Sequence, residues 1–225
     1  MPLVDAKQLI GTAKQLHMHT LTQQEYFRGN LSMTDSSRPV AAGLKRIESN
    51  QDHAVELLAT RGFSDVGLRE MTASLDVTAG AFYHHFAGKD EYFSFLMEAH
   101  YADFLMAVMR SKKTAHRLAA AIDAILRLQT HRPWYFKLAA READRLKQLP
   151  GACEIMLLRQ KINRSLLKAM GDPEAQGDPG NACLDLLEHL LIWTADSHLP
   201  TRERRVVVER VLIAGIIPSA MTTGT

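Results

Sequence analysis

The sequence predicts an all-α fold in which a small unit of three helices precedes a larger helical domain. Apolar residues recur three or four positions apart through most of the 225-residue chain, which is the spacing of a helix face. Runs of valine, threonine and isoleucine are few, so no strand is predicted. Hydrophobic residues make up 46% of the chain and charged residues 23%, which is typical of a globular protein with a full core.

Residues 1–40 are predicted to form an N-terminal arm that is partly flexible. The stretch "RGNLSMTDSSRP" is rich in turn formers, and a short helix is expected before it. Met33 is a candidate alternative start, because "MTDSSRPVAAGLKR" has the polar character of a natural N-terminus.

Residues 41–90 are predicted to contain three helices. The first begins near Leu44 and ends at a glycine cap, Gly62. The second covers 68–75, where Gly67 can act as N-cap and Glu70 can reach back to the cap's N–H. Thr78 can cap the third, 79–85, after the break at 76–78.

Residues 91–225 are predicted to form the second domain. A long helix begins at Gly88 and carries Asp90 and Glu91 in its first turn, where the helix dipole favours negative charge. Turn formers in 171–181 predict a loop. Further helices are expected over about 114–130, 134–148, 152–170, 182–197 and 202–217.

Two short helices joined by a three-residue break, behind a longer helix, indicate a helix-turn-helix, which lays its second helix in the DNA major groove. Tyr83, His84 and His85 would face outward, with Lys89 at the start of the next helix. Adjacent histidines point about 100° apart on a helix and cannot share one metal ion. A pH switch and a phosphate-facing role remain open for the pair. The predicted core of the unit is Leu68, Met71, Leu75, Val77 and Phe82.

Residues 54–93, "AVELLATRGFSDVGLREMTASLDVTAGAFYHHFAGKDEYF", resemble the TetR (tetracycline-repressor) family of bacterial transcription regulators. The resemblance lies in the "RGF" corner, the "REM" start of the second helix, the "VTAGAFYHHF" recognition helix and the "KDE" start of the fourth. It implies binding of a double-stranded palindromic operator by a homodimer and release by a small-molecule effector. The implied DNA-contacting residues are Arg69, Thr78, Ala79, Gly80, Tyr83, His84, His85 and Lys89.

The chain departs from the family pattern in ways that predict weak nonspecific, salt-driven DNA affinity. Val66 and Gly67 stand where members usually have serine or threonine, Ala79 where many have lysine or arginine, and Leu75-Asp76 where Ala-Gly is common. Residues 41–91 hold five basic and eight acidic residues. The alternative is an interaction protein that keeps the fold but acts through a protein partner.

Aromatic residues and methionines of the fourth helix, together with Trp134 and Phe136, predict either plain core or an effector pocket. The resemblance favours a pocket, because family members hold a small molecule among the corresponding helices. The candidate lining residues are His100, Tyr101, Phe104, Trp134 and Phe136.

Residues 110–170 hold 14 lysines and arginines against four acidic residues. This basic region has three open interpretations: a solvated face, contact with an acidic protein or with 171–225 of a sister subunit, and an anionic effector bound by Arg127, His131 or Arg159.

The last two helices carry apolar residues at helical spacing, which predicts packing on the body of the domain or, by the resemblance, a dimer through a four-helix bundle. The candidate interface residues are Leu184, Leu187, Leu191, Val207, Val211 and Ala214.

The sequence gives no sign of an enzyme, a cofactor or a metal site, because it lacks nucleophile, phosphate-loop and zinc motifs. The best candidate for a membrane span, "VVVERVLIAGIIP", is too short and carries Glu209 and Arg210, and no secretion signal is recognised. We therefore expect a cytoplasmic protein with two reduced thiols, Cys153 and Cys183. The effector, the operator and the choice between repressor and activator lie beyond the sequence.

Overall fold

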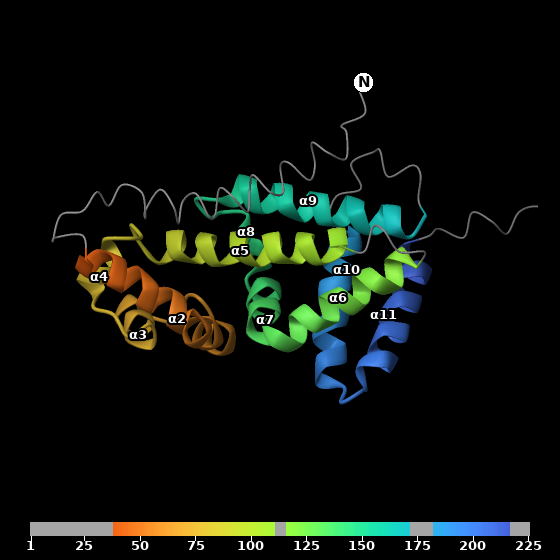
Figure 1. Cartoon of the computed structure of the whole chain (residues 1–225), viewed down its shortest axis with the longest axis horizontal. Coiled ribbons are helices and arrows are strands. Elements are labelled where there is room, and N and C mark those ends of the chain that lie inside the picture. Colours follow the sequence, from red (N-terminus) through yellow and green to blue (C-terminus); the bar gives the residue numbers. More distant parts are fainter. Residues whose placement is uncertain (1–37, 111–115, 172–181, 217–225) are drawn as a thin grey trace, which may run out of the picture.

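The computed structural model describes residues 38–110, 116–171 and 182–216, and all regular structure in these ranges is helical, as predicted. Helices α2, α3 and α4 lie at one end of the molecule (Figure 1). The long helix α5 runs from them to the other end with α9 alongside, and α6, α10 and α11 lie together at that far end (Figure 1). The helix bounds are α2 Arg38–Arg61, α3 Leu68–Ser74, α4 Ala79–Tyr83, α5 Lys89–Arg110, α6 Arg117–His131, α7 Pro133–Arg141, α8 Ala143–Leu146, α9 Ala152–Ala169, α10 Ala182–Asp196 and α11 Thr201–Ile216.

Three helix boundaries differ from the sequence prediction. α2 begins at Arg38 instead of near Leu44, so it includes residues that were expected in the arm. α4 ends at Tyr83, two residues early, with His84 as its C-cap. The single helix expected over 134–148 is divided into α7 and α8 at Glu142. The rest of the arm, with Met33, lies outside the described residues.

The core is organised around α5, whose buried side chains lie on several of its sides. They include Phe93, Leu96, Tyr101 and Phe104, which pack against α6, α7 and α9. A helix that is apolar on several sides is stable only when other helices surround it. In the described ranges, no helix combines the length and apolar character that crossing a membrane requires.

Polar contacts fix the C-terminal end of α2 to the body of the molecule. Gly62 ends α2 with φ of +102°, and its N–H donates to the Leu58 carbonyl at 2.9 Å, as the predicted glycine cap requires. The Arg141 guanidinium donates to the last carbonyls of α2, at 2.9 Å for both Thr60 and Arg61. The positive charge of Arg141 also interacts favourably with the dipole at the C-terminal end of α2. Through these contacts Arg141 connects the three-helix unit to α7.

Candidate nucleic-acid interface

The turn between α3 and α4 depends on a left-handed residue, Asp76, with φ of +54°. Aspartate tolerates this conformation better than most residues that carry a side chain. Asn50 of α2 donates from Nδ2 to the Leu75 carbonyl at 3.3 Å, and Arg46 lies 3.7 Å from the Asp76 carboxylate. The turn between α3 and α4 therefore forms without glycine, and contacts with Asn50 and Arg46 hold it against α2.

α4 is oriented by a cap and by one buried ring. The Thr78 hydroxyl accepts a hydrogen bond from the Ala81 N–H at 3.1 Å, as predicted for the N-cap. Phe82 is fully buried, with its ring centroid 5.3 Å from that of Phe86 and 5.6 Å from that of Tyr92. With Phe82 pointing inward, the opposite side of α4 is left on the surface.

The exposed side of this unit contains six of the eight predicted contact residues. Tyr83 is 54% exposed, which is high for a large aromatic residue. The positions 79 and 83, and 80 and 84, are each four residues apart and therefore lie on one face of the helix. The exposed members are Arg69, Thr78, Ala79, Gly80, Tyr83 and His84. They form what we call the α4 face.

His85 does not join the α4 face. Its side chain is only partly exposed, and Nε2 lies 3.5 Å from where a Cβ on Gly43 would stand. The ring thus points toward α2 and away from His84. The expectation that both histidines share one outward surface is corrected: α4 ends at Tyr83, His84 is its C-cap, and the ring of His85 beyond the cap is directed toward α2.

Lys89 also points inward. Its ammonium donates to the carbonyl oxygens of Phe63 and of Val66, the latter at 2.7 Å, and lies 4.1 Å from the centroid of the Phe63 ring. Burial, and then the charge of Arg145, lower the pKa of Lys89. In this structure the lysine stabilises the corner between α2 and α3, where its predicted role was contact with DNA.

The start of α3 shows the consequence of the missing hydroxyl. Val66 is fully buried, while Gly67 is the exposed N-cap in an extended conformation. Glu70 pairs with Arg61 of α2 instead of reaching back to the cap. Because Lys89 points inward, Arg69 is the one lysine or arginine among the six exposed residues of the predicted contact set.

Comparison with known proteins supports the sequence resemblance. Residues 52–94 match the family model described as "Bacterial regulatory proteins, tetR family". The chain carries the N-terminal domain of the tetR family. No curated protein matches the sequence.

Two solved structures have similar folds. A TetR family transcriptional regulator, PfmR from Thermus thermophilus, superposes with a TM-score of 0.59 at 18% identity, covering 74% of this chain and 97% of that chain. The superantigen Pfit has a TM-score of 0.49 at 18% identity, covering 87% of this chain and 98% of that chain. The match to the tetR family model points to DNA-binding transcription regulation, and the likeness to PfmR shows the fold.

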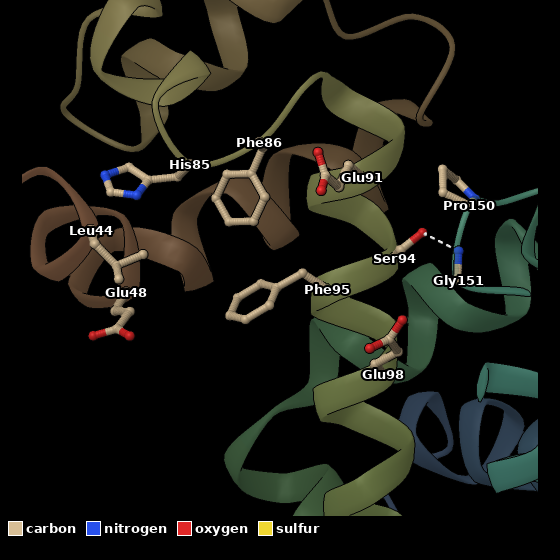
Figure 2. A pocket seen from close by; sticks show the side chains of 10 residues that line it. All are labelled: Leu44, Glu48, His85, Phe86, Glu91, Ser94, Phe95, Glu98, Pro150 and Gly151. Atoms are coloured by element: carbon tan, nitrogen blue, oxygen red, sulfur yellow. Dashed lines mark hydrogen bonds between the residues drawn. The ribbon is translucent and has the colours of Figure 1, made fainter. Parts of the chain in front are cut away.

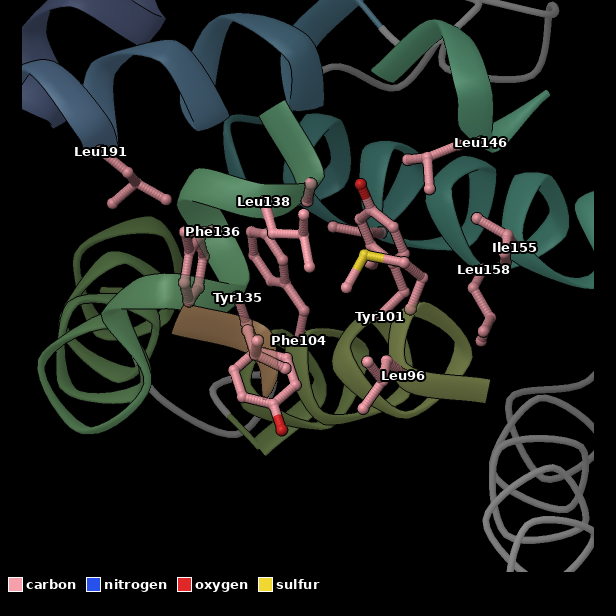
Figure 3. Packing of buried hydrophobic residues seen from close by; sticks show 14 of the residues in the cluster. Leu96, Tyr101, Phe104, Tyr135, Phe136, Leu138, Leu146, Ile155, Leu158 and Leu191 are labelled. Atoms are coloured by element: carbon pink, nitrogen blue, oxygen red, sulfur yellow. The ribbon is translucent and has the colours of Figure 1, made fainter. Parts of the chain in front are cut away.

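Four of the five residues expected to line an effector pocket are packed against one another or their neighbours. His100 is buried. Tyr101, Phe104 and Phe136 are buried as well (Figure 3). The His100 ring centroid is 4.7 Å from that of Phe136 and 6.1 Å from that of Phe104. Trp134 is partly exposed, and the Lys137 ammonium lies 5.1 Å from its ring centroid. In this structure the four buried residues belong to the packed core and Trp134 lies at its edge, so their role as effector lining stays a prediction.

The anionic-effector interpretation loses one of its three candidates. Arg159 is buried, and its guanidinium donates to both carboxylate oxygens of Glu188 at 3.0 Å. It also donates to Asp185 at 2.5 Å and to the Tyr101 hydroxyl. Its charge is balanced inside the protein, whereas Arg127 and His131 are exposed on α6.

The predicted interface residues of α10 are inside the protomer. Leu184, Leu187 and Leu191 are fully buried against the body of the domain. Another stripe of α10 faces outward, with Leu186 and Leu190 partly exposed and Trp193 59% exposed. Of the α11 candidates, Val207 is partly exposed, and Val211 and Ala214 are exposed. The leucines of α10 follow helical spacing on both faces, and the three that were predicted for an interface are the ones buried in the protomer.

Proposed function

We propose that this protein is a transcription repressor that binds a palindromic operator as a homodimer and leaves it when a small molecule binds. The observation that carries the proposal is the α4 face, which consists of exposed residues of α4 and its caps together with Arg69 of α3, with Phe82 anchoring the opposite side of α4. Hydroxyl and imidazole groups donate to phosphate oxygens, and the exposed backbone at Gly80 allows close approach to DNA. Binding of the effector would lower the affinity for the operator, and binding of the operator would lower the affinity for the effector by the same factor.

The composition of the α4 face predicts an unusual dependence on salt. Arg69 is the one cation of this face, so a dimer would neutralise about two phosphates through it, and the logarithmic salt slope would be about −2. Affinity for the operator should then fall only about tenfold between 50 and 200 mM salt. A sequence-specific repressor with this surface relies on neutral donors more than on charge.

Titration of the protein with its own upstream DNA, followed by fluorescence anisotropy at the two salt concentrations, tests the proposal. Tyr83→Ala should weaken operator binding about tenfold or more, and Arg69→Gln should also reduce the salt slope. Lys147→Gln, at the exposed C-cap of α8, is the matched control and should bind as the unchanged protein does. Equal and negligible binding to every DNA would refute the repressor and support action through a protein partner.

We further propose that dimerisation uses the outward stripes of α10 and α11. Leu186, Leu190 and Trp193 follow one another at spacings of four and three residues, as do Val207, Val211 and Ala214 at four and three. Trp193→Glu should convert the dimer to a monomer in analytical ultracentrifugation. Leu157→Glu, at an exposed leucine of α9, should leave the dimer intact. A monomeric unmodified protein, or a dimeric Trp193→Glu variant, would contradict this interface.

The proposed repressor would act in the cytoplasm without catalysis and without a cofactor. Among the described residues, no group of three His, Cys, Asp or Glu side chains is arranged to hold a metal ion.

A further inference from the structure

A pocket of about 220 Å³ lies where the N-terminal unit meets the body of the molecule (Figure 2). Its walls come from α2, from the residues that follow α4, from α5 and from the turn at 150–151. The rings of Phe86 and Phe95 face its middle, with centroids 5.5 Å apart (Figure 2). The volume is below the roughly 300–1,000 Å³ of sites for drug-sized ligands, so the occupant would be small.

The charge of the lining has one sign. The ten residues around the pocket include three glutamates, Glu48, Glu91 and Glu98, and no lysine or arginine. One histidine, His85, stands at the α2 side (Figure 2). Such a lining favours a positively charged occupant and disfavours an anion, because only a cation would offset these charges at short range.

Glu98 is the carboxylate best placed to hold a cation. No hydrogen bond or ion pair to this side chain is found in the part of the chain that the structure describes, and the nearest charge that acts on it is another acid, Glu154 of α9. Burial, and then the charge of Glu154, raise the pKa of Glu98 to about 7. The Glu98 carboxylate lies directly against Gly151, so close that an oxygen occupies the place where a Cβ on residue 151 would stand. Glu91, by contrast, already accepts a hydrogen bond from the Ala87 N–H.

We propose that this pocket binds a small aromatic cation, with its ring against Phe86 and Phe95 and its positive charge against Glu98. Aromatic faces attract cations, and a partly desolvated carboxylate beside them strengthens the attraction. A neutral aromatic molecule would gain only the apolar contacts, and an anion would be repelled. The site is separate from the aromatic core around His100, where the effector pocket was expected from the sequence.

The pocket lies at the base of the α4 face, because Phe86 also packs on the buried Phe82 of α4. If the proposed function is right, an occupant of this pocket would bias the angle between α4 and α5 and thus the spacing of the two half-sites. That consequence rests on the proposed function, but binding of the cation does not.

The test is isothermal titration calorimetry of the full chain, without DNA, using benzyltrimethylammonium as the probe. This cation has an aromatic ring and carries no titratable proton. Benzyl alcohol is the neutral comparison and benzoate the anionic one, and both should bind at least tenfold more weakly. Glu98→Gln should lower the affinity for the cation at least tenfold, while Glu56→Gln, at an exposed acid of α2, should not change it.

The pH dependence gives a second readout that needs no variant. The cation requires an ionised Glu98, so its affinity should rise about tenfold from pH 6 to pH 8, with a proton released on binding near pH 6. The other titratable groups near the site are Glu48, His85, Glu91 and Glu154. If Glu98 is responsible, the Glu98→Gln variant shows a flatter profile.

Location is checked by NMR, in which the probe should shift the amide signals of Gly151 and Glu98. Equal affinity for benzyl alcohol or benzoate, an unchanged Glu98→Gln variant or unshifted signals would each overturn the proposal. Because these measurements omit DNA, their failure leaves the proposed repressor intact, and failure of operator binding leaves the cation site intact.

Discussion

Replacing Glu188 by leucine should destabilise the protein strongly, because it leaves the buried charge of Arg159 without its main partner. The two side chains are 5% and 7% exposed, and they are joined by two hydrogen bonds of 3.0 Å. Both carboxylate oxygens are thus used in a region from which water is largely excluded. The Glu188 carboxylate is also the main opposite charge that raises the pKa of Arg159.

The expected loss can be worked from these contacts. Removing one member of a buried pair typically costs about 3–5 kcal/mol, since an uncompensated charge remains. Asp185 still lies 2.5 Å from the guanidinium and is half exposed, so we expect the lower end, about 3 kcal/mol. Replacing both residues, as Arg159→Met with Glu188→Leu, removes the charge problem. It should cost only about 1 kcal/mol, mainly for the lost partner of the Tyr101 hydroxyl.

Urea unfolding followed by circular dichroism measures both values. The protein concentration must be the same in every experiment, because the proposed dimerisation would make apparent stability depend on it. Glu203→Leu, at an exposed acid of α11, is the control and should change the midpoint little. A loss below about 1 kcal/mol for Glu188→Leu, or a double variant as unstable as the single one, would refute the reasoning. Arg159 would then become available again as a partner for an anion.

Three further predictions follow from buried or anchored groups. Arg141→Gln should cost about 1–2 kcal/mol of unfolding free energy, because the carbonyls at the end of α2 lose a cationic donor. The same urea assay measures this loss, with Lys147→Gln as the control. Equal unfolding free energies for the two variants would contradict the prediction. Burial lowers the pKa of His100 to about 3, so the unfolded chain binds a proton between about pH 6.5 and 3 that the folded chain does not. Stability should therefore fall as pH falls through this window, by at most about 1.4 kcal/mol per pH unit from this group, and His100→Phe should flatten the profile; an unchanged profile would assign the loss to other groups. Cys153 is exposed and should react with a thiol reagent in the folded protein, whereas burial raises the pKa of the Cys183 thiol to about 12 and should delay its reaction until unfolding; two fast thiols would refute the packing of α10.

Some of the α4 face could be predicted because it depends on neighbours in the chain. A cap such as Thr78 acts on an amide three residues on, and the burial of Phe82 determines which residues of the same helix point outward. His85 and Lys89 were misplaced because their partners come from other elements. His85 packs toward Gly43, and Lys89 bonds to carbonyls of the corner between α2 and α3.

The pocket beside Glu98 left no signal in the sequence. Phe86, Phe95 and Glu98 are near one another in the chain, but Gly151 follows more than 50 residues later and brings the backbone against the carboxylate. A glutamate in a helix is expected to face solvent, so the sequence alone does not single out Glu98. Only the packing of the 150–151 turn against α5 makes it part of a pocket.

The sequence by itself determined the helices, the turn between α3 and α4 and the resemblance to the tetR family. Each of these follows from local spacing, caps and motifs, which act over a few residues. Tertiary structure alone decided which face of each helix is covered. α10 illustrates this, since its leucines satisfy helical spacing on two sides. Contacts with the body bury Leu184, Leu187 and Leu191 and leave Trp193 at the surface, because the neighbouring helices determine the rotation of α10 about its axis.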